Sequence, residues 1–138
     1  MINTQDIVIK MSDTGLVPIK IELFGIGILE ANIIRHIAPL SADAIIDKLP
    51  FVLRGRFSFG TKNYWTLPGL ELYKGTNPKS TNIMEKGDIV YNPKTDEFII
   101  ILENLQMPNK VNKVGKVNSN LELLLRARNG LNTKISKR

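Results

Sequence analysis

The chain has 138 residues, which suits one folded domain, and it contains no cysteine. Its 43% hydrophobic and 23% charged residues exclude a disordered or fibrous protein, and the lack of cysteine excludes disulfides and thiolate metal sites. The net charge of +6 comes from the C-terminal end, because residues 1–50 carry four Lys/Arg against six Asp/Glu and residues 106–138 carry eight against one.

The N-terminal third predicts a β-hairpin followed by a short helical piece. Residues 6–11 and 18–24 alternate apolar and polar side chains, as half-buried strands do, and residues 13–15 supply a turn between them. Over residues 28–37 the apolar positions fit helical spacing, and Pro39 stops any helix there. The first residues lack the basic start and apolar core of a signal peptide, and the longest apolar runs are strand-sized. We therefore expect a cytoplasmic protein with no membrane partner.

One helix and a series of short strands follow. The helix spans Ser41 to Leu49, because Ser41 can cap its start, its apolar residues form one stripe, and Pro50 ends it. Short β-type runs separated by Gly, Pro and Asn lie at residues 52–59, 63–67, 70–73, 88–91 and 97–103. This spacing favours a barrel or a sandwich, and residues 74–82, which have almost no apolar side chain, are expected to form an exposed loop.

The C-terminal third predicts one more strand, a short helix and a tail. Residues 110–117 alternate as a strand does, and residues 121–125 suit a short helix. A turn at Asn129 and Gly130 leads into residues 131–138, which we expect to be a flexible basic tail. No internal repeat or second core is visible, so we expect a single domain over residues 1–130.

The order of these segments resembles the small cyclophilin-like domain family of archaea and bacteria. The stretches that carry the resemblance are PIKIEL, GRFSFG, KGDIVYNP, FIIILEN, NKVGKV and LELLLRARNG, within residues 17–130. KGDIVYNP, residues 86–93, is the most specific of them. The resemblance implies a closed, mostly antiparallel β-barrel with one or two short capping helices.

Two departures from that family bear on catalysis. Family members often carry Arg-Trp-Gly in the strand after the helix, whereas this chain has Ser58-Phe59-Gly60 and its only tryptophan at Trp65. The segment whose arginine acts in true cyclophilin prolyl isomerases is missing, so neither Arg54 nor Arg56 inherits a catalytic role. We do not expect an enzyme, and a weak peptidyl-prolyl cis/trans isomerase is the alternative.

We expect instead a module that binds a small molecule or an extended peptide in a surface cleft. The candidate cleft residues offer a cation, aromatic rings and amides: Arg56, Tyr64, Trp65, Gln106, Asn109 and Asn112. The last three are placed near the cleft by analogy with the family fold alone. Strand alternation would put Arg54 and Arg56 on the face opposite Phe57 and Phe59, and the simpler interpretation has the arginines exposed and the phenylalanines in the core.

No metal, cofactor or acid–base site is predicted. His36 is the only histidine, which excludes a histidine cluster, and Gly25-Ile26-Gly27 lacks the rest of a phosphate-binding loop. Asp96 and Glu97 suit a hairpin turn better than a catalytic pair.

The basic C-terminal third raises nucleic-acid binding as a further alternative. Closely spaced cations gain free energy by releasing the counterions condensed on nucleic acid. The candidates are Lys110, Lys113, Lys116, Arg126 and Arg128. Solvated basic residues near a fraying terminus are the simpler interpretation.

Overall fold

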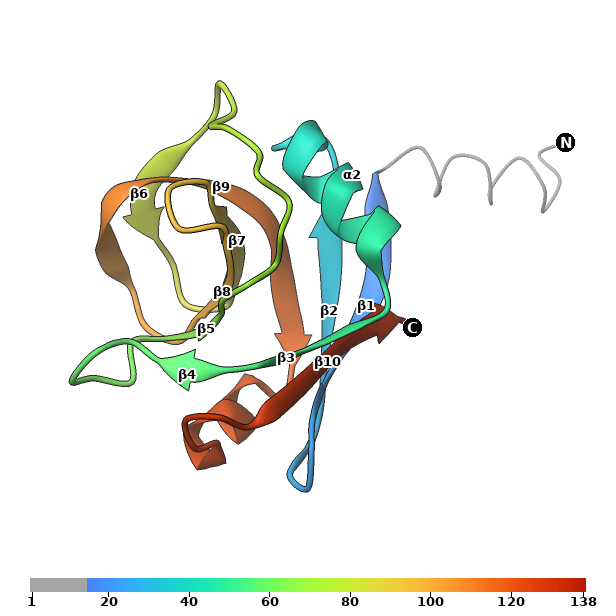
Figure 1. Ribbon diagram of the computed structural model, residues 1–138, viewed down its shortest axis with the longest axis vertical. Coiled ribbons are helices and arrows are strands. Elements are labelled where there is room, and N and C mark those ends of the chain that lie inside the picture. The colour runs from blue at the N-terminus through green and yellow to red at the C-terminus, as the bar shows by residue number, and fades with distance from the viewer. Residues whose placement is uncertain (1–14) are drawn as a thin grey trace, which may run out of the picture.

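Ten β-strands run through residues 15–138, the part of the chain that the computed structural model describes (Figure 1). The strands are β1 (Leu16–Leu23), β2 (Gly27–Ile34), β3 (Phe51–Arg54), β4 (Arg56–Phe57), β5 (Tyr64–Leu67), β6 (Thr81–Met84), β7 (Asp88–Asn92), β8 (Glu97–Ile101), β9 (Leu105–Ser119) and β10 (Asn132–Lys137). The same residues contain one α-helix, α2 (Pro39–Lys48), and one 3-10 helix, η1 (Leu121–Arg126). The prediction of a mainly β fold is confirmed. Neither helix of this range has the length and apolar character needed to cross a membrane.

The strands form an antiparallel sheet whose two edge strands, β3 and β4, follow one another in the chain. The strand order is β3-β10-β1-β2-β9-β7-β8-β5-β4, and β6 pairs with β9 outside this path. β3 and β4 therefore lie at opposite ends of the path, although only Gly55 separates them in sequence. No ladder joins β3 to β4 within residues 15–138, so the sheet is not closed and the predicted closed barrel is not confirmed.

Gly55 and Trp65 bring the two edges into contact by packing. The backbone N–H of Gly55 donates to the carbonyl of Leu131 (2.9 Å), and the carbonyl of Gly55 accepts from the N–H of Gly130 (2.7 Å). A Cβ at Gly55 would lie 2.1 Å from Cε2 of the Trp65 ring. Trp65 is fully buried, and its Nε1–H donates to Oγ1 of Thr133 (3.2 Å). Position 55 therefore has room only for glycine while Trp65 keeps this place.

Two apolar clusters fill the structure. The main core lies on one face of the curved sheet, and α2 contributes Ala42 and Ile45 to it. The second cluster consists of Met84, Val90, Ile99, Ile101, Met107 and Val111. It forms because β6 and the first half of β9 cover the other face of β7 and β8. This double cover explains why β8 contains an uninterrupted apolar run, Phe98 to Ile101, in which every residue is buried.

The polar residues of KGDIVYNP stabilise turns around β7. The Asp88 carboxylate accepts the backbone N–H of Glu85 (2.8 Å) and pairs with the ammonium groups of Lys113 (3.0 Å) and Lys116 (3.3 Å). Oδ1 of Asn92 accepts a backbone hydrogen bond from the turn that follows β7 (3.0 Å). The stretch with the most specific family resemblance is thus explained by local structure.

Asp96, in the turn between β7 and β8, fastens the loop that follows β5. Its carboxylate accepts the backbone N–H groups of Glu71 (2.6 Å), Leu72 (3.0 Å) and Tyr73 (2.9 Å), and also the hydroxyl of Tyr91. Burial raises the pKa of Asp96, but these hydrogen bonds to the charged form outweigh it and hold the pKa below its ordinary value. Burial, together with the bond to Asp96, raises the pKa of Tyr91 to about 12.

The helical piece expected over residues 28–37 is wrong, because strand β2 occupies most of that range. Leu29, Ala31 and Ile33 are buried and alternate with less buried neighbours, which is the period of a strand. The hairpin is therefore β1 with β2. The strand predicted at residues 6–11 lies outside the described residues.

The flexible tail expected over residues 131–138 is also wrong. β10 lies between β1 and β3 and pairs with both of them. Thr133 and Ile135 are fully buried, so Lys134 between them lies on a strand of the sheet interior rather than on a free end. Buried and less buried residues alternate along this segment as in a strand, but its high content of basic residues suggested a solvated tail instead.

The helix predicted from Ser41 to Leu49 is confirmed as α2, with a different start. Ala38 occupies the N-cap position and makes no side-chain cap. Ser41 is buried inside the first turn, where its hydroxyl accepts a hydrogen bond from Nδ2 of Asn112 (2.9 Å). The serine therefore fastens the helix to β9 instead of capping it.

Candidate functional site

A cleft of about 540 Å³ opens on the β4 edge of the sheet, and we call it the β4–β5 cleft. Its lining residues come from β4, β5, the loop between them, the start of β8 and the turn before β10: Arg56, Phe57, Ser58, Phe59, Gly60, Tyr64, Thr66, Glu97 and Asn129. Strand register explains the grouping of the polar residues. Arg56 lies opposite Thr66 in the ladder, and Tyr64 is two residues from Thr66 on the same face.

One positive and one negative side chain lie side by side in the cleft. Oε2 of Glu97 accepts a hydrogen bond from Oγ1 of Thr66 (2.9 Å) and lies 3.7 Å from a terminal nitrogen of Arg56. The side chain of Glu97 is only 13% exposed, whereas that of Arg56 is 61% exposed. Glu97 is thus held in place, while most of the Arg56 guanidinium remains accessible.

Tyr64 completes the polar part of the cleft. Burial raises the pKa of its hydroxyl, the negative charge of Glu97 raises it further, and the positive charge of Arg56 lowers it. The net shift is upward, so Tyr64 is a neutral hydrogen-bond donor at neutral pH.

Aromatic rings form the apolar part of the cleft. The Phe57 ring packs edge-on against Trp65 with 4.9 Å between centroids, and Nζ of Lys62 lies 5.0 Å from the Phe57 centroid. Phe59, in the loop between β4 and β5, is fully exposed. A shallower hollow of about 320 Å³ continues past Phe57 to Lys62 and Asn129. The arrangement offers a cation, a carboxylate and apolar ring faces within one opening.

The structure brings together only part of the predicted cleft. Arg56 and Tyr64 both line it, whereas Trp65 points to the opposite face and is buried in the main core. The expected separation of arginine from phenylalanine holds for Phe57, which pairs with Trp65 in the ladder and packs against the main core, although it also borders the cleft. The expectation is wrong for Phe59, which is fully exposed at the cleft rather than buried in the core. β4 is two residues long, so the strand alternation ends before Phe59.

The three predicted amide residues lie elsewhere, on β9. Gln106 is exposed and lies opposite Ile83 of β6. Asn109 donates to Oδ1 of Asn92 (2.9 Å). Asn112 is buried. None of the three lines the β4–β5 cleft.

Asn112 connects three parts of the structure. Its Nδ2 donates to the hydroxyl of Ser41 (2.9 Å) and to the carbonyl of Gly75 (2.9 Å), and its Oδ1 accepts the backbone N–H of Asn77 (2.9 Å). Each polar atom of the side chain is therefore used in holding α2 and the loop after β5 against β9.

Sequence reasoning missed Thr66, Glu97 and Asn129. The alternation that pairs Tyr64 with Thr66 is visible in β5 and would have found Thr66. Glu97 and Asn129 are brought in by β8 and by the turn before β10, and Oδ1 of Asn129 accepts the backbone N–H of Phe57 (2.9 Å). No local signal marks these two contacts, because they join segments far apart in the chain.

The five basic candidates do not form one surface. Lys113 and Lys116 pair with the buried carboxylate of Asp88 at 3.0 and 3.3 Å, and Lys116 also lies 4.0 Å from the carboxylate of Glu85, so their charge is partly compensated. Lys110 is exposed on the first half of β9, whereas Arg126 and Arg128 are exposed at the end of η1 and just after it.

Another cleft, of about 390 Å³, lies between η1 and the turn after β8. Its lining residues are Lys86, Leu102, Glu103, Asn104, Leu121, Glu122 and Leu125. It has two carboxylates, one lysine and no aromatic ring, and so offers less varied recognition chemistry than the β4–β5 cleft. Residues 15–138 contain no group of three or more His, Cys, Asp or Glu side chains able to hold a metal ion.

Comparison with known proteins identifies the fold and no family. No family model and no curated protein matches the chain. The solution structure of the hypothetical protein AF2241 from Archaeoglobus fulgidus has a TM-score of 0.73 and 16% identity, over 91% of this chain and 97% of that chain. The structure of McbB in complex with tryptophan has a TM-score of 0.74 and 13% identity, over 87% of this chain and 44% of that chain. At such identities the similarity shows a shared fold alone.

Proposed function

We propose that this chain is a binding module whose β4–β5 cleft holds a small molecule or the side chain of an extended peptide. The observation that carries the proposal is the Arg56 guanidinium, which is mostly exposed beside aromatic rings and has only a distant partner at 3.7 Å. A guanidinium in this position suits a carboxylate or a carbonyl group, because it donates parallel hydrogen bonds. The rings of Phe57 and Phe59 suit the apolar part of the same ligand.

An amino acid or short peptide with an aromatic side chain fits this set of groups. Arg56 would receive its carboxylate, Glu97 its ammonium or N–H group, and the exposed ring of Phe59 its side chain. McbB was solved in complex with tryptophan, which makes tryptophan a reasonable first probe. The proposal itself rests on the residues of the cleft.

The experiment compares ligand binding in two arginine variants. We expect tryptophan and N-acetylated aromatic dipeptides to raise the melting temperature of the protein. Arg56→Gln should weaken their binding about tenfold, which corresponds to loss of one charge-assisted hydrogen bond. Arg54→Gln is the matched control, because Arg54 is an exposed arginine nearby that does not line the cleft. Equal binding by both variants would show that the ligand lies elsewhere.

Weak prolyl isomerisation is a second candidate, favoured by the grouping of Arg56 with Phe57, Phe59 and Tyr64 in one cleft. Twisting an X-Pro bond needs a pocket that favours the twisted amide, with a cationic donor and apolar walls. The test is cis/trans exchange in a proline tetrapeptide at micromolar protein. Exchange at the buffer rate rejects this activity and leaves the binding proposal standing.

Kinship with the small cyclophilin-like family remains part of the proposal. Its support is the order of sequence stretches together with an antiparallel sheet whose edge strands are consecutive at Gly55. A cytoplasmic location also remains a prediction.

A further inference from the structure

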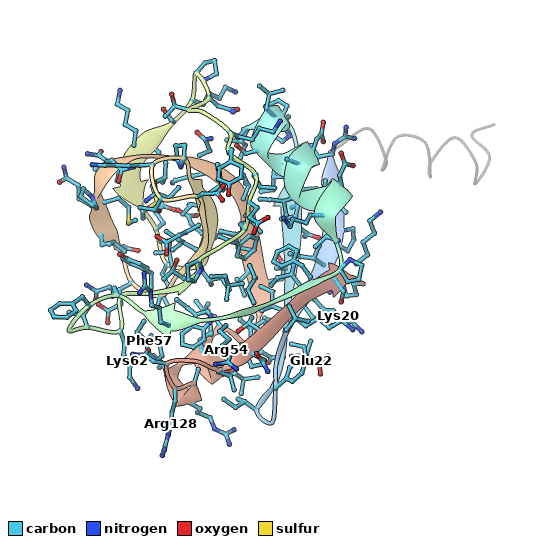
Figure 2. All side chains as sticks on the ribbon, in the orientation of Figure 1. Lys20, Glu22, Arg54, Phe57, Lys62 and Arg128 are labelled. Carbon is cyan, nitrogen blue, oxygen red and sulfur yellow. The ribbon has the colours of Figure 1, made fainter. Side chains whose placement is uncertain are left out.

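Four cations from two chain segments lie on one surface next to the β4–β5 cleft. We call this surface the basic rim. Its cations are Arg54, Lys62, Arg126 and Arg128. Figure 2 shows Arg54, Lys62 and Arg128 at the end of the molecule that carries η1.

Hydrogen bonds hold the two segments together. Nζ of Lys62 donates to the carbonyl of Leu125 (3.1 Å), directly before Arg126. Oδ1 of Asn129, directly after Arg128, accepts the backbone N–H of Phe57 (2.9 Å). Arg54 lies opposite Asn132 in the ladder between β3 and β10. The basic residues of both segments are therefore fixed as neighbours, although the sequence separates them by more than 60 positions.

The positive charge of the basic rim is not compensated. All four side chains are exposed, and none forms an ion pair with a carboxylate of residues 15–138. Other cations of the chain do, including Arg35 with Asp43 (2.7 Å) and Arg138 with Glu30 (2.9 Å). Glu122 is the only acidic residue after position 105. The basic rim thus attracts anions with little competition from the protein itself.

An exposed aromatic ring accompanies these cations. Phe59 is fully exposed in the loop that ends near Lys62, and the Phe57 ring lies under the Lys62 ammonium at 5.0 Å. Leaving a phenylalanine entirely in water gives up about 2 kcal/mol of burial free energy, so the folded protein gains nothing from the ring at this place. Cations beside an open aromatic face are the combination that binds single-stranded nucleic acid: phosphates meet the cations and bases stack on the ring.

We infer that the basic rim binds single-stranded nucleic acid, with phosphates on Arg54, Lys62, Arg126 and Arg128 and a base stacked on Phe59. The basic rim shares Phe59 with the ligand proposed for the β4–β5 cleft, but none of its four cations lines that cleft. A duplex suits the surface less well, because its bases are stacked on one another and offer no open face to Phe59. A membrane suits it less well too, because stable interfacial binding needs a larger apolar area than one exposed ring.

The first measurement is the salt dependence of binding to a fluorescent oligothymidine, followed by anisotropy. For single strands the slope of log K against log salt is about −0.7 per neutralised phosphate, so four cations give about −3. Lys62→Gln, Arg126→Gln and Arg128→Gln combined should weaken binding at least tenfold at low salt and reduce the slope by about 2. Since Lys62 also bonds to η1, the double variant Arg126→Gln with Arg128→Gln is measured beside it and should lower the slope by about 1.4.

A matched control removes the same charge from another part of the surface. Lys79, Lys94 and Lys110 are exposed, and none forms an ion pair within residues 15–138. Lys94 lies in the β7–β8 turn, at the end of β8 away from the loop between β4 and β5, since Tyr64 pairs with Ile101. The triple Gln variant of these lysines should retain the slope of the unmodified protein.

Phe59→Ala tests the stacking part of the inference. Phe59→Ala should lower the affinity for oligothymidine about fivefold or more and leave the salt slope unchanged, whereas Phe59→Trp should retain the affinity of the unmodified protein. The inference is overturned if the control lysines matter as much as the rim, if duplex DNA binds as tightly as the single strand, or if Phe59→Ala has no effect. Preferential binding to vesicles of anionic phospholipid, with no binding to the oligonucleotide, would also reject it.

Discussion

Gly55→Ala is the most direct test of how the two sheet edges meet. The new Cβ would lie 2.1 Å from Cε2 and 2.2 Å from Cζ2 of Trp65, where ordinary contact begins near 3.4 Å. The ring must therefore retreat by more than 1 Å, but it is fully buried and its Nε1–H is bonded to Thr133. Overpacking costs about 1–3 kcal/mol and loss of the hydrogen bond about 1 kcal/mol, so we expect the free energy of unfolding to fall by about 3 kcal/mol.

Urea unfolding followed by tryptophan fluorescence measures this change where it arises, because Trp65 is the only tryptophan of the chain. Gly75→Ala is the control: position 75 has open space and no positive φ, and the substitution should be neutral or stabilise by about 0.5 kcal/mol. In a Trp65→Leu background, followed by circular dichroism, Gly55→Ala should cost less than about 1 kcal/mol, because the clashing ring is gone. If Gly55→Ala is as mild as Gly75→Ala, or costs the same with and without Trp65, the proposed contact between the edges is incorrect.

Three further predictions concern the polar residues that hold loops. Asp96→Asn should lower the free energy of unfolding by about 2–3 kcal/mol in thermal or urea denaturation, because the backbone N–H groups lose a charged acceptor. Since the folded-state pKa of Asp96 is depressed, its contribution to stability is present above the unfolded pKa and is lost as pH falls through the folded pKa. An Asp96→Asn protein whose acid unfolding matches that of the parent would contradict this. Folding raises the pKa of Tyr91 from 10.0 to about 12, so the free energy of unfolding should decline as pH rises from the lower to the higher of these values. Tyr91→Phe should lack this part of the alkaline decline. Asn112→Ala removes three hydrogen bonds, two of them buried, and should cost about 3 kcal/mol. Amide exchange should become faster at Asn77, whose N–H loses its acceptor, and unchanged protection there would refute the role given to Asn112.

The local elements that were predicted correctly have strong short-range signals. The helix ending before Pro50 and the strands β7 and β8 are confirmed because an apolar stripe and apolar runs need no knowledge of distant contacts. The error over residues 28–37 arose where isoleucines fit both periods, and pairing with β1 decided between them. Short apolar segments are ambiguous in this way until a partner strand is known.

The candidate site shows the same division. Arg56 and Tyr64 were foreseen from the types of residue in one segment, and both line the β4–β5 cleft. Trp65 was misplaced because its aromatic character suits a cleft as well as a core, and only the register with β4 and β8 shows which face it occupies. Asn129 enters through a turn more than 70 positions from Phe57, and nothing in its surroundings marks it.

Composition and short-range patterning by themselves determined that this chain is mainly β and where most of its strands and its α-helix lie, because burial with a period of two or 3.6 is a property of neighbouring residues. Tertiary structure alone decided that β10 is an interior strand, that β3 and β4 lie at the two edges of one sheet, and that Arg54, Lys62, Arg126 and Arg128 share a surface. Those features depend on which strands pair, and the choice among pairings is made by the free energy of the whole chain, to which each segment contributes only a part.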